Sequence, residues 1–168
     1  GNMGLDGKAP DGRGKWSILR SGHGRDFKSD GTTNEYSDRF GLELTFARAL
    51  KEKFPDRNIA LVKYSRGGTS IDADAAAATR FGCWDPDWTG GEGEGSGINQ
   101  YDHFLATLRQ ARADKDIDND GEEDRWIPSG ILWMQGESDA MEPEVAKAYG
   151  ENLKELMGKI RENFGSPE

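Results

Sequence analysis

The chain has 168 residues, of which 32% are charged and 34% hydrophobic, so it is long enough for one domain with a hydrophobic core. Its formal net charge of −9 argues against nucleic-acid binding, which depends on neutralising phosphates, and fits a neutral or sugar-like ligand or a bound cation. No apolar run approaches the ~20 residues that a bilayer-spanning helix needs, so we expect no membrane partner.

The N-terminal half is predicted to hold a long loop, one helix and one strand. Residues 1–37 are rich in Gly, Asp, Lys and Ser and lack periodicity, which is typical of loops. Apolar residues then recur at four-residue steps and predict a helix that Pro55 ends, with its face formed by Leu42, Phe46, Leu50 and Phe54. The apolar run at 59–64 predicts a strand.

The C-terminal half is predicted to hold an irregular stretch at 71–97, two helices and a second strand. The first of these helices has one apolar face, formed by Tyr101, Phe104, Leu105 and Leu108. An acidic loop at 114–125 precedes an apolar run at 130–134 that predicts the strand. The last helix has Pro143 in its first turn and an apolar stripe of Val145, Tyr149, Leu153, Leu156, Ile160 and Phe164.

This order of elements indicates the α/β class. Strands separated by helices pair in parallel through right-handed crossovers, and a parallel sheet covered on both faces suits strands this apolar. Two strands do not complete such a sheet, so we expect either a further strand in the N-terminal loop or a chain that is part of a larger domain. We therefore treat 1–168 as a single, incomplete domain.

Polar, glycine-containing loops follow both predicted strands, at 65–70 and 135–139. The carboxyl ends of adjacent parallel strands meet at one edge of a sheet, where ligands bind. Gly67 and Gly68 expose backbone N–H groups there, and Gln135 offers a side-chain amide, which are the parts of an oxyanion hole. The alternative is two ordinary strand-to-helix turns capped by Ser and Asp.

Three segments of the chain resemble the SGNH-hydrolase superfamily, within the group of sialate O-acetylesterases and carbohydrate esterase family 6. They are Phe40-Gly-Leu-Glu-Leu-Thr-Phe-Ala-Arg-Ala-Leu50, Ala60-Leu-Val-Lys-Tyr-Ser-Arg-Gly-Gly-Thr-Ser70 and Leu132-Trp-Met-Gln-Gly-Glu-Ser-Asp-Ala140, followed by a helix with Tyr149 and Asn152. The similarity spans most of 38–164 in the family's order. It implies a three-layer α/β/α sandwich with a parallel, flavodoxin-like sheet.

The resemblance implies that a serine-type esterase removes O-acetyl groups from carbohydrates, of the acetylxylan or sialate type, through an acyl-enzyme. It implies that Gly67, Gly68 and Gln135 form the oxyanion hole and that Glu137 orders neighbouring loops or the catalytic histidine. It further implies that no cofactor is required, that the partner is a small-molecule or polysaccharide acetyl ester, and that the protein is secreted or periplasmic.

The resemblance also implies groups that the sequence does not contain. The family's nucleophile lies in a Gly-Gln-Ser-Asn-Met segment, of which Asn2 and Met3 match the end while Gly1 takes the place of the serine. The family's Asp-x-x-His segment, with the base, lies beyond Glu168. We therefore expect the chain to hold the middle of the domain without its first and last strands, its nucleophile or its base.

Five residues are candidates for contacting the substrate: Asn2, Thr69, Ser70, Trp84 and Trp88. The two tryptophans flank Asp-Pro-Asp, where they either form a sugar-stacking wall or pin the long loop to the body of the domain. The single cysteine, Cys83, has no histidine near it in sequence and is predicted to be a packing residue. His103 lies off the apolar face of its helix and is predicted to be exposed, and His23 is predicted to be a surface loop residue.

The acidic loop presents carboxylates at alternate positions before a glycine, which is how calcium loops arrange their oxygen ligands. The candidate ligands are Asp116, Asp118, Asp120, Glu122 and Asp124. Position twelve of an EF-hand would be Ile127 rather than glutamate, so the candidate is a dockerin-like or irregular structural calcium loop. The alternative is a solvated acidic turn. With calcium, the chain also fits a second function, that of a non-catalytic carbohydrate-binding or structural relative.

Overall fold

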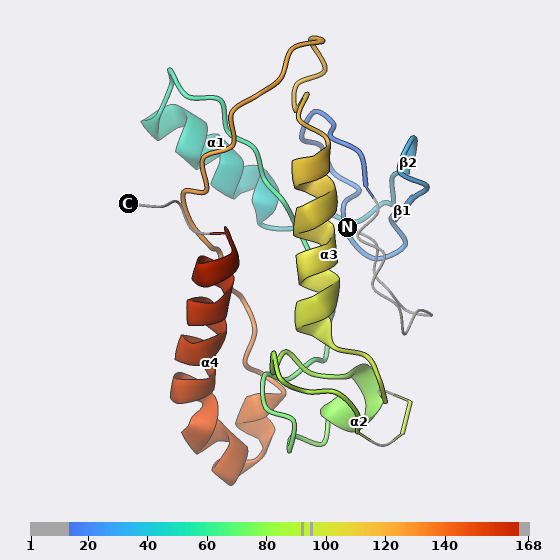
Figure 1. Ribbon diagram of the computed structural model, residues 1–168, viewed down its shortest axis with the longest axis vertical. Coiled ribbons are helices and arrows are strands. Elements are labelled where there is room, and N and C mark those ends of the chain that lie inside the picture. Colours follow the sequence, from blue (N-terminus) through green and yellow to red (C-terminus); the bar gives the residue numbers. More distant parts are fainter. Residues whose placement is uncertain (1–13, 92, 95, 165–168) are drawn as a thin grey trace. The chain divides into compact units, whose positions relative to one another are not determined.

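The computed structural model describes residues 14–91, 93–94 and 96–164, and Figure 1 shows the elements within them. In chain order they are β1 (Lys28–Ser29), β2 (Asn34–Glu35), α1 (Glu43–Lys53), α2 (Ala78–Phe81), α3 (Gln100–Ala113), the 3-10 helix η1 (Asp139–Met141) and α4 (Pro143–Phe164). None of the described helices combines the length and the apolar character needed to cross a membrane.

The described residues form two compact units. The first contains residues 14–65 and 104–125, and the second contains 66–103 and 126–164, apart from 92 and 95. Among the described residues, the chain passes from one unit to the other after Ser65, within α3 after His103, and after Arg125. The prediction of a single domain over 1–168 stays a prediction.

The three long helices confirm the predictions from apolar spacing. Helix α1 ends at Lys53, just before the proline that excludes a further turn. Helix α4 buries part of its predicted stripe, at Val145, Leu156 and Ile160. Apolar residues three and four positions apart share one helix face, which is why sequence periodicity is sufficient to find these helices.

The first unit contains a small hairpin and an aromatic cluster. Strands β1 and β2 pair antiparallel within the predicted N-terminal loop, with Lys28 opposite Glu35. Phe27 is buried, and His23 is half-buried with its ring centroid 5.2 Å from that of Phe27, so His23 is not the open surface residue expected. At the first turn of α1, the buried Glu43 accepts a hydrogen bond from Lys63 at 3.0 Å.

In the second unit, three short stretches of backbone lie side by side in parallel. Isolated bridges join Ser70 to Cys83 and Cys83 to Asn99. Their hydrogen bonds run from Trp84 N to Ser70 O at 2.9 Å and from Gln100 N to Cys83 O at 2.8 Å. Parallel pairing is therefore present in this unit, within and at the edges of the stretch 71–97 that the sequence predicted to be irregular.

The prediction of strands at 59–64 and 130–134 is wrong, because neither segment pairs with another strand among the described residues. Several of their apolar side chains are exposed, with Leu132 at 54% and Met134 at 76%. Apolar composition favours a strand only where neighbouring backbone completes its hydrogen bonds and covers its faces. The described residues contain a two-stranded antiparallel sheet and no parallel sheet, so the three-layer sandwich stays a prediction.

The exposed position predicted for His103 is also wrong, because its exposure is 4%. Helix α3 buries a polar stripe, Gln100, His103 and Thr107, in addition to the apolar residues Tyr101, Leu105 and Leu108. The positions in each set are three or four residues apart and therefore share a helix face. Counting only apolar residues missed the polar stripe.

Candidate active site

In the second unit, the loops at 66–72 and 135–139 are joined by one buried carboxylate. Asp139 is 0% exposed and lies in the first turn of η1. Its oxygens accept hydrogen bonds from the backbone N–H of Ile71 at 3.0 and 3.1 Å and of Asp72 at 3.1 Å. The side-chain amide of Gln135 donates to Asp139 Oδ2 at 2.6 Å. A buried carboxylate is stable only where donors surround it, so Asp139 fixes the two loops against each other.

Both hydrogens of the Gln135 side-chain amide are engaged in this arrangement. One of its hydrogens goes to Asp139 and the other to the backbone carbonyl of Thr69, at 2.7 Å. Its oxygen Oε1 is buried and has no hydrogen-bond partner among the described residues. Both contacts at one end of this amide are made to hydrogen-bond acceptors, so that end is the NH2 group and the other end is the oxygen. Gln135 therefore holds the carbonyl of the glycine loop in place.

The glycine loop depends on glycine at one of its two positions. Gly68 has φ +78°, and a Cβ there would lie 2.7 Å from Cε2 of Phe81. At Gly67 a Cβ would meet nothing within 4 Å. Both residues are exposed, and no described residue accepts a hydrogen bond from either backbone N–H. These two N–H groups are thus the donors of the predicted oxyanion hole that remain available to a ligand.

Helix α4 holds the other loop through Tyr149. The Tyr149 hydroxyl donates to the Gln135 backbone carbonyl and accepts from Trp133 Nε1, the second contact being 3.2 Å long. Gly136 has φ +145°, and a Cβ there would lie 3.1 Å from the same hydroxyl. Asn152, one turn further along α4, donates to Asp72 Oδ2 at 2.8 Å. The helix therefore contacts both loops of the site.

The predicted substrate residues beside the glycine loop have mainly internal contacts. Thr69 and Ser70 are buried, and the Ser70 hydroxyl donates to the Asp72 carbonyl at 2.8 Å. Trp84 is 5% exposed, donates to Thr69 Oγ1 at 3.0 Å and packs edge-on against Trp133 with ring centroids 5.0 Å apart. In this structure Trp84 pins its loop and presents no open ring face for a sugar.

The remaining candidates are more open or lie elsewhere. Trp88 is half-buried, and its backbone carbonyl accepts from Asn99 Nδ2 at 2.8 Å. Glu137 is exposed, and no hydrogen bond or ion pair joins its carboxylate to another described residue. Asn2 lies outside the described residues. The site role of each of these three stays a prediction.

Cys83 is the packing residue that the sequence predicted. Its side chain is fully buried, and burial raises the pKa of the thiol to about 12. A thiol that stays protonated at neutral pH is a poor nucleophile. Cys83 therefore contributes to the core of the second unit and not to chemistry.

The acidic loop belongs to the first unit and brings three of its five candidate ligands together. Carboxylate oxygens of Asp116, Asp118 and Asp120 lie within 4.8 Å of one another. Asp124 has a different role, because its Oδ2 accepts from the backbone N–H of Ile117 at 2.8 Å. Glu122 is exposed, and its backbone N–H donates to Asp120 Oδ1 at 2.8 Å. The carboxylates of Asp116, Asp118 and Asp120 are thus oxygen ligands of the kind that a hard cation such as calcium prefers.

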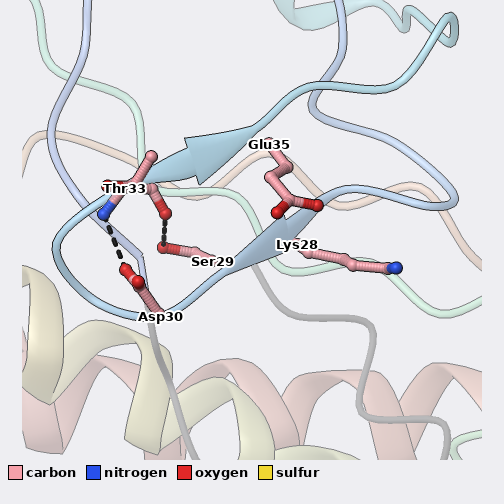
Figure 2. A pocket seen from close by; sticks show the side chains of 5 residues that line it. All are labelled: Lys28, Ser29, Asp30, Thr33 and Glu35. Carbon is pink, nitrogen blue, oxygen red and sulfur yellow. Dashed lines mark hydrogen bonds between the residues drawn. The ribbon is translucent and has the colours of Figure 1, made fainter.

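A hollow of about 220 Å³ lies at the hairpin of the first unit, and Figure 2 shows the five side chains that line it. Asp30 accepts hydrogen bonds from the backbone N–H groups of Thr32 and Thr33 at 2.8 and 2.7 Å, which lower the pKa of its carboxyl to about 2. These bonds close the turn between β1 and β2. The hollow is therefore a feature of the hairpin turn and contains none of the predicted catalytic residues.

Sequence reasoning did not identify Asp139, Trp133 or the Tyr149 hydroxyl as parts of the site. All three stand in segments that carried the family resemblance, so their chain position was the available signal. Residues 15–168 match the family model described as carbohydrate esterase, sialic acid-specific acetylesterase. A search of curated proteins and a search of solved structures found no match.

Proposed function

The chain belongs to the carbohydrate esterase family of sialic acid-specific acetylesterases, and on that premise we propose that it removes O-acetyl groups from a carbohydrate through a serine acyl-enzyme. The observation that supports this most is the joining of the glycine loop to the Gln135–Asp139 loop by a buried carboxylate. Such a preorganised pair of loops is what electrostatic stabilisation of a tetrahedral intermediate requires.

In the proposed reaction, a serine oxygen attacks the acetyl carbonyl and a histidine takes the serine proton. The carbonyl oxygen becomes an oxyanion, which accepts hydrogen bonds from the N–H groups of Gly67 and Gly68. Gln135 joins them by moving one amide hydrogen from the Thr69 carbonyl to the oxyanion. The sugar hydroxyl leaves with the proton from the histidine, and water then releases acetate from the acyl-enzyme. No cofactor takes part.

The gene sequence on either side of the region that encodes this chain tests where the serine nucleophile and the histidine base come from. A Gly-Gln-Ser directly before Asn2 and an Asp-x-x-His after Glu168 would supply the nucleophile and the base. With both in place, the full domain is expected to adopt the three-layer α/β/α sandwich. A gene without either motif would contradict the esterase proposal and favour a non-catalytic relative.

Hydrolysis of an aryl acetate by the natural protein that carries this sequence tests the reaction itself. Gln135→Ala is expected to lower kcat by roughly 10²-fold or more, the usual cost of losing an oxyanion donor. Gln110→Ala is the matched control, because Gln110 is exposed on α3 and lies outside the two loops. An unchanged rate for Gln135→Ala would overturn the oxyanion role.

The convergence of Asp116, Asp118 and Asp120 supports a second proposal, a structural calcium ion in the acidic loop. In the alternative function, the chain is a non-catalytic carbohydrate-binding or structural relative that this ion stabilises. Calcium at 100 times its Kd would stabilise the fold by about 2.7 kcal/mol. We expect the melting temperature to rise in millimolar calcium, and Asp118→Asn to abolish the rise while the exposed Asp56→Asn keeps it. No rise in the unmodified protein would refute the calcium proposal.

A protein that acts on extracellular glycans works outside the cytoplasm. We therefore propose a secreted or periplasmic location, which the family's usual substrates support. Fractionation of the source cells tests it, and recovery of the protein in the cytosol alone would contradict it.

A further inference from the structure

A closed circuit of contacts surrounds Gln135 in the second unit. The Tyr149 hydroxyl donates to the Gln135 backbone carbonyl and accepts from Trp133 Nε1 at 3.2 Å. The Trp133 ring packs edge-on against Trp84, whose Nε1 donates to Thr69 Oγ1 at 3.0 Å. The circuit closes where the Gln135 side-chain amide donates to the Thr69 carbonyl at 2.7 Å. The backbone of Gln135 is therefore held from α4, and its side chain is held from the glycine loop.

Tyr149 is the member of this circuit that α4 supplies. Its ring packs against Gly136, where φ is +145° and a Cβ would lie 3.1 Å from the hydroxyl oxygen. A hydroxyl has one hydrogen to donate, and here that hydrogen is directed at the Gln135 carbonyl. Because the carbonyl and the side chain belong to the same residue, fixing the carbonyl also limits where the side-chain amide of Gln135 lies.

A different contact holds the N–H groups of the glycine loop. The Phe81 ring packs on Gly68 so closely that a Cβ there would lie 2.7 Å from Cε2. The guanidinium carbons of Arg66 and Arg80 each lie 4.8 Å from the centroid of the same ring. These cation–π contacts hold Phe81 in place on the glycine loop. Removing the Tyr149 hydroxyl should therefore leave the donors of the glycine loop where they are.

Resting on the proposed esterase function, we propose that Tyr149 is a positioning residue for turnover, which acts through Gln135 on the oxyanion. Tyr149 itself touches neither the substrate nor the reacting atoms. It fixes the place from which the Gln135 amide reaches the oxyanion, and a displaced donor loses much of its effect. The oxyanion forms only after the acetyl ester has bound, so the contribution of Tyr149 falls on kcat and leaves KM nearly unchanged.

Tyr149→Phe tests this role in the natural protein that carries this sequence, with an aryl acetate as the substrate. We expect kcat to fall about 10-fold at an unchanged KM, which is a smaller loss than that of Gln135→Ala because the amide stays in the site. Tyr101→Phe is the matched control, because the Tyr101 hydroxyl accepts from Asn163 Nδ2 at 3.0 Å and lies on α3, outside the two loops. The control should keep its kcat. An unchanged kcat for Tyr149→Phe, or an equal fall in the control, would overturn the proposal.

A double-mutant cycle separates positioning from a general loss of stability. If Tyr149 acts through Gln135, then Tyr149→Phe should lower kcat no further in a protein that already carries Gln135→Ala. A hydroxyl with a purely structural role would lower kcat by the same factor in both backgrounds. That additive result would refute the positioning role.

The NMR signals of the Gln135 side-chain amide provide a measurement that does not require turnover. Both amide hydrogens are bonded in the unmodified protein. In Tyr149→Phe we expect their chemical shifts to move and their exchange with solvent to become faster, whereas Tyr101→Phe should leave both unchanged. Turnover by the unmodified protein with amide signals that Tyr149→Phe does not alter would contradict the positioning role and leave the esterase function standing. Altered amide signals without any turnover by the unmodified protein would support the hold of Tyr149 on Gln135 and contradict the esterase function.

Discussion

Replacing Asp139 with alanine tests whether one buried carboxylate holds the two site loops together. The change removes the acceptor for three donors, the N–H groups of Ile71 and Asp72 and the Gln135 amide. A buried donor left without a partner costs about 1–3 kcal/mol. The loss of a partner should cost most for the Ile71 N–H, which is buried, and less for the other two donors, which are partly buried and more accessible to water. We therefore expect a loss of about 3–5 kcal/mol in the free energy of unfolding.

Urea unfolding followed by tryptophan fluorescence measures this loss, and thermal melting should show a midpoint lower by roughly 10 °C. Asp139→Asn keeps one acceptor oxygen but places its amide NH2 group against other donors. Its loss in the free energy of unfolding should therefore be about half that of Asp139→Ala. The control Asp87→Ala changes an exposed carboxylate of the same unit and should stay within about 0.5 kcal/mol. A loss below about 1 kcal/mol for Asp139→Ala would show that the loops hold their arrangement without this carboxylate.

Three further predictions concern single residues. Gly68→Ala forces a side chain into φ +78° against the Phe81 ring and should lower the free energy of unfolding in urea by about 1–3 kcal/mol. Gly67→Ala should leave that free energy nearly unchanged, and equal losses for the two variants would contradict this prediction. Cys83, with its pKa raised to about 12 by burial, should react with iodoacetamide at pH 8 only after denaturation, and rapid labelling of the folded chain would contradict its burial. Burial raises the pKa of Glu43, but hydrogen bonds from its own backbone N–H and from Lys63 outweigh this and hold it below 4.5. The contribution of Glu43 to stability is present above pH 4.5 and is lost as the pH falls through its lowered pKa in the folded state. Lys63→Met should therefore reduce the loss of stability to urea at acid pH. An unchanged dependence of stability on pH would argue against the Glu43–Lys63 pair.

The helices could be predicted from the sequence because their signal is local. In α1 and α4, apolar residues recur at steps of three and four, and a proline marks one end of each helix. Part of this stripe is buried in α4, whereas the buried residue of α1 is Glu43. The segments 59–64 and 130–134 have strand composition, yet a strand is defined by the partner that completes its hydrogen bonds. Composition cannot supply that partner, and the strand predictions failed for this reason.

The candidate site could be located from the sequence, although the contacts within it could not. The order of residues in Gln135-Gly-Glu-Ser-Asp139 and in the glycine loop indicated two polar loops that belong together. The hydrogen bond from Gln135 to the Thr69 carbonyl joins residues that are 66 positions apart. Those from the backbone N–H groups of Ile71 and Asp72 to Asp139 join residues that are 68 and 67 positions apart. No local pattern distinguishes a side chain that contacts a ligand from one that holds another loop.

By itself, the sequence determined the family, the long helices and the two loops that form the candidate site, because each rests on the identity and spacing of nearby residues. Only the tertiary structure decided that Asp139 is buried between the loops, that Trp84 is a packing residue and that Arg66 and Arg80 share the Phe81 ring. The physical reason is that burial and charge pairing depend on which distant segments are neighbours in space. A carboxylate, an indole or a guanidinium has no fixed role until its surroundings set the cost of removing it from water.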